Sequence, residues 1–90
     1  MGHKAEDILK AMLEVLVAAL VDDVDSINIS STTTAAGDTV LFEVDVAKED
    51  VGKLIGRSGK TAGAMRHILG AASAKLKVRT ILSIPDKKEQ

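Results

Sequence analysis

The residues with the clearest chemical potential are two glycines three positions apart, set among cations. Residues 52–60 read Gly-Lys-Leu-Ile-Gly-Arg-Ser-Gly-Lys, with Gly56 and Gly59 on either side of Arg57 and Ser58. Glycine has no Cβ and tolerates a positive φ, so a ligand's backbone can approach it closely. A helix that begins just after such a turn adds exposed N–H groups and the positive end of its dipole. The pattern predicts binding of a phosphate chain, above all a nucleic-acid backbone.

Formal charge is separated between the two halves of the chain. Residues 1–50 hold three cations and eleven anions, whereas residues 51–85 hold seven cations and no anion. The seven cations are Lys53, Arg57, Lys60, Arg66, Lys75, Lys77 and Arg79. Such a separation favours a polyanion on one side of the molecule. The alternatives are that the two halves attract each other, or that the acidic half aids solubility.

Composition excludes several classes of function. The chain has 90 residues, 46% of them hydrophobic, with one aromatic side chain, Phe42, and no cysteine. This length predicts one domain with an aliphatic core, and the lack of cysteine excludes disulfides, Cys-based zinc sites and thiol chemistry. Two histidines are too few for a convincing metal site, and the longest apolar run, residues 15–21, is too short to span a bilayer. We expect a cytoplasmic protein with no metal, no cofactor and no membrane partner.

Hydrophobic periodicity indicates a helix and then a hairpin ahead of the glycines. Residues 5–21 place apolar side chains at spacings of three and four, which is typical of an amphipathic helix. That face consists of Ile8, Leu9, Met12, Leu13, Leu16, Val17 and Leu20. Residues 25–30 and 39–46 alternate as two strands, joined by a polar loop over residues 31–38.

Two helices are expected on either side of the glycines, followed by a strand. Residues 48–55 form the first helix and residues 60–74 the second, which buries Met65, Ile68, Leu69 and Ala72. Residues 76–84 alternate as a last strand that ends before Pro85. The order is helix, strand, strand, helix, helix, strand. One three-stranded sheet with its helices on one face is the economical way to bury these apolar stripes.

This order, with Ile-Gly-Arg-Ser-Gly-Lys (residues 55–60) between the two central helices, resembles the type II KH domain. The likeness covers about residues 4–85, and residues 46–62 look most like the small stand-alone KH RNA-binding proteins of bacteria. The resemblance implies an α+β fold, a type II KH fold of αββααβ order, with a three-stranded mixed sheet and three helices packed on one face. It also implies a single KH domain over residues 1–90, with a core of about 4–85 and a flexible tail at 86–90.

The function that the resemblance implies agrees with the chemistry of the residues. KH domains hold about four single-stranded nucleotides in a cleft, with the glycine loop against the backbone. This implies a non-catalytic, single-stranded RNA-binding protein acting as a post-transcriptional regulator or RNA chaperone. The implied RNA-binding residues are Gly56, Arg57, Ser58, Gly59, Lys60, Lys53, Ile55, Ala62 and Arg66. With no Tyr or Trp in the chain, base contact would be aliphatic rather than by aromatic stacking.

Within that set the resemblance gives the residues different roles. Arg57 and Ser58 would contact phosphate, and Lys53 and Lys60 could reach the same strand. The floor of the cleft for the bases would be apolar, formed by Ile55, Ala62 and part of the last strand, including Ile81. No residue is assigned a catalytic or metal-binding role.

Two other functions stay open. The outward apolar residues Leu41 and Ile81 would suit a protein-assembly module with residual nucleic-acid binding, as a homodimer or a heterodimer with another KH-domain protein. A phosphate-acting enzyme is disfavoured, because the loop lacks the spacing and Lys-Ser/Thr ending of a Walker A motif. No His, Cys or paired carboxylate lies near the glycines to supply acid, base or metal ligand. His67 is better interpreted as a surface side chain than as a catalyst.

Overall fold

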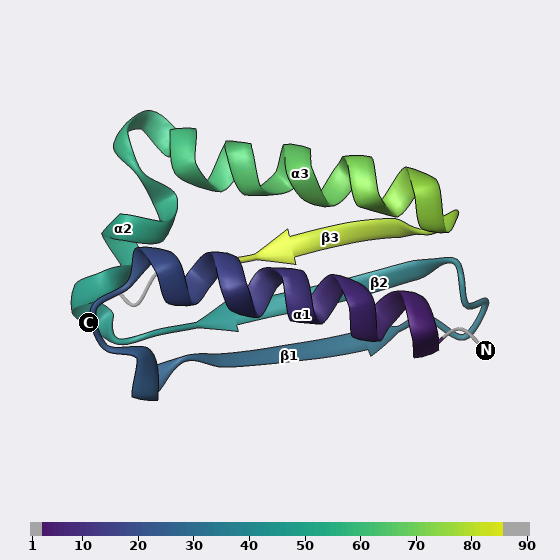
Figure 1. The fold of residues 1–90 in the computed structure, drawn as a ribbon, viewed down its shortest axis with the longest axis horizontal. Helices are drawn as coiled ribbons and strands as arrows, with labels where there is room; N and C mark the ends of the chain where they lie inside the picture. Colours follow the sequence, from purple (N-terminus) through teal and green to yellow (C-terminus); the bar gives the residue numbers. More distant parts are fainter. Residues whose placement is uncertain (1–2, 86–90) are drawn as a thin grey trace.

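A computed structural model describes residues 3–85 and has the predicted αββααβ order (Figure 1). The helices and strands are α1 (His3–Leu20), β1 (Asn28–Thr33), β2 (Thr39–Asp45), α2 (Val51–Ile55), α3 (Lys60–Leu76) and β3 (Arg79–Ser83). Three short 3-10 turns, η1 (Val24–Ser26), η2 (Lys48–Asp50) and η3 (Arg57–Gly59), join them. The expected tail, residues 86–90, lies outside the described residues.

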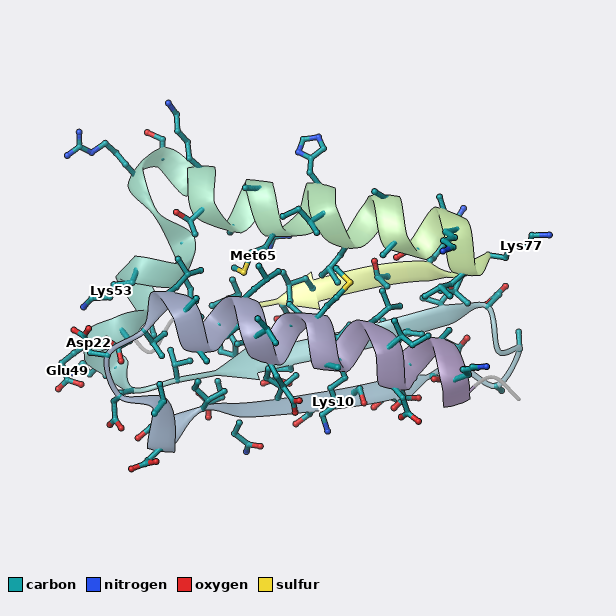
Figure 2. All side chains as sticks on the ribbon, in the orientation of Figure 1. Lys10, Asp22, Glu49, Lys53, Met65 and Lys77 are labelled. Atoms are coloured by element: carbon teal, nitrogen blue, oxygen red, sulfur yellow. The ribbon has the colours of Figure 1, made fainter. Side chains whose placement is uncertain are left out.

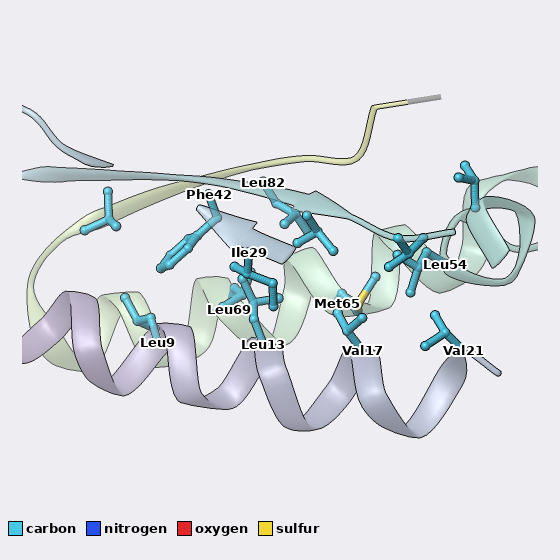
Figure 3. Close-up of a cluster of buried hydrophobic side chains, with 14 residues drawn as sticks. Leu9, Leu13, Val17, Val21, Ile29, Phe42, Leu54, Met65, Leu69 and Leu82 are labelled. Atoms are coloured by element: carbon cyan, nitrogen blue, oxygen red, sulfur yellow. The ribbon is translucent and has the colours of Figure 1, made fainter. Parts of the chain in front are cut away.

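The sheet has the order β1-β2-β3 and is mixed, because β1 is antiparallel to β2 and β3 is parallel to β2. The parallel pair requires a crossover, which α2 and α3 provide. The helices cover one face of this sheet, with α1 and α3 running in opposite directions beneath the strands (Figure 3). The α+β fold class and the type II KH architecture are therefore confirmed.

The core fills the space between the sheet and the helices with aliphatic side chains and Phe42 (Figure 3). Alternation along β2 buries Val40, Phe42 and Val44, while spacings of four along α1 bury Leu9, Leu13 and Val17. The helices on either side of the glycine loop contribute the buried residues Val51, Leu54, Ala62, Met65, Leu69 and Ser73. The loop is thus anchored by apolar side chains on both sides.

Two of the three predicted strands have different boundaries in the structure. β1 begins at Asn28 and continues to Thr33, so the residues expected as a loop from position 31 belong partly to the strand. The physical reason is an acceptor on α1: the hydroxyl of Ser31 donates to the Glu6 carboxylate at 2.5 Å, and the hydroxyl of Thr33 donates to the same carboxylate. At the other end, α3 runs on to Leu76, so that β3 is shorter than expected.

Three apolar residues expected in the core are exposed instead, namely Ile8, Leu20 and Ile68. Each helix buries only a narrow face against the sheet, and the outer edges of the predicted stripes extend beyond that contact. Ile8 and Ile68 come from different helices, yet both line one shallow groove between α1 and α3.

Truncating Phe42, which is 1% exposed, tests this core. We expect Phe42→Ala to lower the free energy of unfolding by about 3–5 kcal/mol, because it removes apolar contact and leaves a cavity. Ile81→Ala, at an exposed position, should change it by less than about 0.5 kcal/mol. Urea unfolding followed by circular dichroism measures both. Equal losses for the two variants would contradict the burial of Phe42.

Candidate nucleic-acid interface

The glycine loop (residues 56–59) makes a tight reversal between α2 and α3. Gly56 has φ 77° and ψ 172°, and a Cβ there would lie 2.7 Å from the backbone nitrogen of Thr61 and against its side chain. No larger residue fits without moving the start of α3. Gly59 also has a positive φ, 75°, but faces open space, so its requirement is conformational alone. The Gly59 N–H donates to the Gly56 carbonyl at 3.1 Å and closes the turn.

The loop presents its polar side chains to solvent. Arg57, Ser58 and Lys60 are exposed, and Ser58 adopts a left-handed conformation with φ 57° that non-glycine residues seldom take. Lys60 begins the 17-residue helix α3, whose first turn carries no acidic side chain. Because the N-terminal end of a helix is electropositive, the dipole and the two cations act in the same direction. This arrangement suits an anion such as a phosphate.

A groove runs between α3 and the edge strand β3. One hollow of about 240 Å³ is lined by Arg66, Leu69, Thr80, Ile81 and Leu82. A second hollow of about 490 Å³ shares three of these residues and extends along α3 to Gly70 and Arg79. The Arg66 guanidinium spans the groove and donates to the Leu82 carbonyl at 3.1 Å. The side chains that line the two hollows include two arginines and no carboxylate, so the groove is positively charged.

The predicted site residues fall into two groups. Arg57, Ser58 and Lys60 lie on the loop and its exit, and Arg66 lies further along the same helix, on the groove. Ile55 is half-buried against the core and Ala62 is 4% exposed, and neither lines the hollows. Their role as a floor for the bases stays a prediction.

Most residues that line the groove were missing from the predicted site, among them Gly70, Thr80 and Arg79. Gly70 follows Arg66 by four positions, so the two lie on one side of α3. That spacing on α3, together with the alternation along the last strand, was the sequence signal that could have identified the groove residues. Arg79 was counted among the cations of the second half of the chain but was not assigned to the site.

Lys53 lies among acids at the base of the loop. Its Nζ is 3.3 Å from the Asp50 carboxylate and 3.4 Å from the Asp22 carboxylate. The pKa of Lys53 is raised above its ordinary value, mainly by the hydrogen bond to Asp50 and next by the hydrogen bond to Asp22. Lys53, Asp22 and Asp50 form what we call the Lys53 cluster; Figure 2 shows Lys53 and Asp22 at the end of the molecule where α2 lies.

Asp50 anchors this cluster from within the fold. It is buried, and its carboxylate accepts a hydrogen bond from the Asp23 backbone N–H at 3.0 Å. That bond, helped by the charge of Lys53, holds the pKa of Asp50 below its ordinary value despite the opposing effect of burial. The turn after α1 is thereby tied to the start of α2, the helix that carries the glycine loop.

Within residues 3–85, His, Cys, Asp and Glu side chains form no group of three or more that could hold a metal ion. Over the same residues, every helix is too short or too polar to cross a bilayer.

Comparison with known proteins gives consistent matches. The family described as KhpA/KhpB, KH domain, matches residues 10–84. RNA-binding protein KhpA of Clostridium acetobutylicum is 36% identical over 76 residues, which cover 84% of this chain and 99% of that protein. RNA-binding protein KhpA of Halalkalibacterium halodurans is 37% identical over 78 residues, covering 87% of this chain and 100% of that protein. No solved structure matches.

The lowered pKa of Asp50 predicts a dependence of stability on pH. A carboxyl group whose pKa is lower in the folded state stabilises the fold above its unfolded pKa, near 3.8, and loses that contribution as pH falls through the folded value. Asp50→Asn should therefore be less stable than the parent at neutral pH, and the difference should shrink below about pH 4. Urea unfolding at a series of pH values measures this difference.

The matched control for Asp50→Asn is Asp25→Asn, which removes an exposed carboxylate from the turn after α1. It should stay close to the parent throughout the series. A difference between Asp50→Asn and the parent that stays constant down to pH 3 would contradict the role of Asp50.

Proposed function

Because the chain belongs to the KhpA/KhpB KH-domain family, we propose that it binds single-stranded RNA and holds the RNA backbone against the glycine loop. The observation that carries this proposal is the solvent-facing turn, in which Gly56 permits the close approach of Thr61 and Gly59 faces open space. Arg57 and Lys60 lie there at the electropositive start of α3. The curated relatives named above are RNA-binding proteins, which agrees with that chemistry.

The proposed binding mode divides the residues by their exposure. Arg57, Ser58 and Lys60 contact phosphate, and the RNA strand continues past Arg66 along the groove between α3 and β3. Ile55 and Ala62 offer only their exposed atoms to a base, so most apolar contact falls to Ile81 and its neighbours. Contacts made largely to the backbone and to aliphatic surface discriminate weakly between bases. We propose a non-catalytic role in the cytoplasm, as a post-transcriptional regulator or an RNA chaperone.

The proposal is tested by removing cations from the loop. Any side chain at Gly56 would press on Thr61, so substitutions of exposed cations are the cleaner test. Arg57→Gln with Lys60→Gln should weaken binding of a short, mixed-sequence single-stranded RNA at least tenfold at low salt. If the parent neutralises three phosphates, the slope of the logarithm of the binding constant against the logarithm of salt concentration should be about −2. The double variant neutralises one, so its slope should be about −0.7. Fluorescence anisotropy at several salt concentrations measures both quantities.

The matched control removes two cations from the other end of α3. Lys75→Gln with Lys77→Gln makes the same change in net charge and should weaken binding much less. Circular dichroism of each variant checks that the fold is retained. If both pairs reduce the affinity equally, the interaction is general attraction to a cationic half, and the loop assignment is refuted.

A second candidate function is assembly with another KH protein, and exposed apolar surface favours it. Leu41 and Ile81 are exposed as expected and pair in register on the open face of the sheet. A larger apolar surface lies on the helices, in a groove of about 510 Å³. It is lined by Ile8, Ala11, Met12, Val15, Leu16 and Ile68. We propose a second copy of the chain as its occupant.

Charge on the two helices supports a second copy. Over its described residues, α1 carries more acidic than basic side chains, including exposed Asp7 and Glu14, whereas α3 carries basic side chains and no acidic one, including exposed Lys75. α1 and α3 lie beside each other in opposite directions (Figure 1). A two-fold axis along the groove between them would place α1 of each copy over α3 of the other. The acidic helix of each copy then lies over the basic helix of the other, and the groove between α3 and β3 remains open on both copies.

A charge placed on this helical surface should prevent assembly. Val15 is 70% exposed, so Val15→Glu costs the monomer little but buries a carboxylate in the proposed contact. We expect a monomer at concentrations where the parent is a dimer, as measured by sedimentation velocity with and without RNA. Ile81→Glu, on the open sheet face, should leave the dimer intact. If Ile81→Glu disrupts the dimer and Val15→Glu does not, the interface lies on the open face of the sheet and the helical groove is refuted as its location.

A further inference from the structure

Lys53 has two counter-ions that differ in their freedom to move. The Asp50 side chain is 2% exposed and the Asp22 side chain is 83% exposed, while that of Lys53 is 44% exposed. Asp50 is fixed by the Asp23 backbone N–H and lies three residues before Lys53, on the same turn of the chain. Asp22 reaches Lys53 from the turn after α1, and its side chain faces solvent. Asp50 is therefore the buried, hydrogen-bonded partner of Lys53, and Asp22 is the solvent-exposed one.

We propose that Asp22 competes with RNA phosphate for the Lys53 ammonium and so sets the affinity of the glycine loop for RNA. The inference rests on the proposed RNA-binding function and adds an intramolecular competitor to it. Lys53 contributes to binding only when its ammonium turns from Asp22 to a phosphate. Asp22 is then a residue that tunes affinity without touching RNA.

The local charge balance explains why the competition matters. The Lys53 cluster carries one positive and two negative charges, so an approaching phosphate meets no net attraction from it while Asp22 is in place. An exposed ion pair is weak, because water screens it and both side chains lose freedom, so a phosphate can replace Asp22. The buried Asp50 carboxylate, in contrast, remains bonded through the exchange.

The position of Lys53 makes such an exchange feasible. Lys53 precedes Gly56 by three residues, and α2 is continuous up to the loop, since the Gly56 N–H donates to the Gly52 carbonyl at 2.8 Å. Lys53 thus stands one helical turn from the residues proposed to hold phosphate. Figure 2 shows Lys53 and Asp22 together beside α2, at the same end of the molecule as the glycine loop.

A purely structural role for the ion pair is the competing explanation. Asp22 and Asp23 follow the C-terminus of α1, where negative charge is unfavourable, and a nearby ammonium offsets it. On that explanation, removal of the Asp22 charge changes stability and leaves RNA affinity unchanged. The two explanations therefore separate in a binding measurement.

The test compares Asp22→Asn with Asp25→Asn, which makes the same change in charge in the adjoining η1 turn. With a fluorescein-labelled single-stranded RNA at low salt, we expect Asp22→Asn to bind about two- to fivefold more tightly than the parent, and Asp25→Asn to bind nearly as the parent does. The salt slope of Asp22→Asn should steepen by about 0.7, because one more phosphate is neutralised. In a Lys53→Gln background, Asp22→Asn should have no further effect.

Three outcomes overturn the inference. They are equal gains for Asp22→Asn and Asp25→Asn, a gain that persists without Lys53, and an unchanged affinity accompanied by altered stability. Failure of the proposed function is different, because the parent would then bind no single-stranded RNA, or would bind it as well without the cations at Arg57 and Lys60. The parent and the loop variant are measured first for this reason.

Discussion

The reversal between α2 and α3 depends on one close approach, that of Gly56 to Thr61. The absent side chain lets α3 start beside the end of α2, and the buried residues Leu54 and Ala62 then hold the two helices from either side. The placement of the loop cations follows from that contact. The cations of the loop stand clear of the sheet because the chain turns within four residues, and the electropositive start of α3 is directed outwards with them.

Charge is distributed at two levels. Along the chain, the first half is acidic and the second half is basic, a separation that favours a polyanion on the side of the basic residues. At close range the separation is incomplete, because Asp22 and Asp50 come from the acidic half and pair with Lys53 of the basic half. The same attraction that joins the two halves of the fold thus reduces the positive charge available beside the loop.

Much of the fold was predictable because periodicity reports burial, and the alternation of Val40, Phe42 and Val44 left little choice of face. The prediction was wrong where polar side chains find partners far along the chain. Ser31 and Thr33 looked like a loop, but Glu6 of α1 accepts their hydroxyls and keeps them in a strand. The loop residues were predictable from local spacing alone. The ion pairs of Lys53 were not, since one of its partners lies thirty-one positions away.

The hydrogen bond from Arg66 to Leu82 has a consequence for the sheet itself. β3 is an edge strand, and such edges offer backbone groups to which a foreign strand can add. The Arg66 guanidinium donates a hydrogen bond to one of these carbonyls, that of Leu82, at 3.1 Å and places a positive charge at the edge. Charged side chains at exposed edges are a common protection against aggregation. Arg66 thus protects the sheet edge against the addition of a foreign strand as well as lining the groove. Its replacement by a neutral residue leaves that edge more open to aggregation.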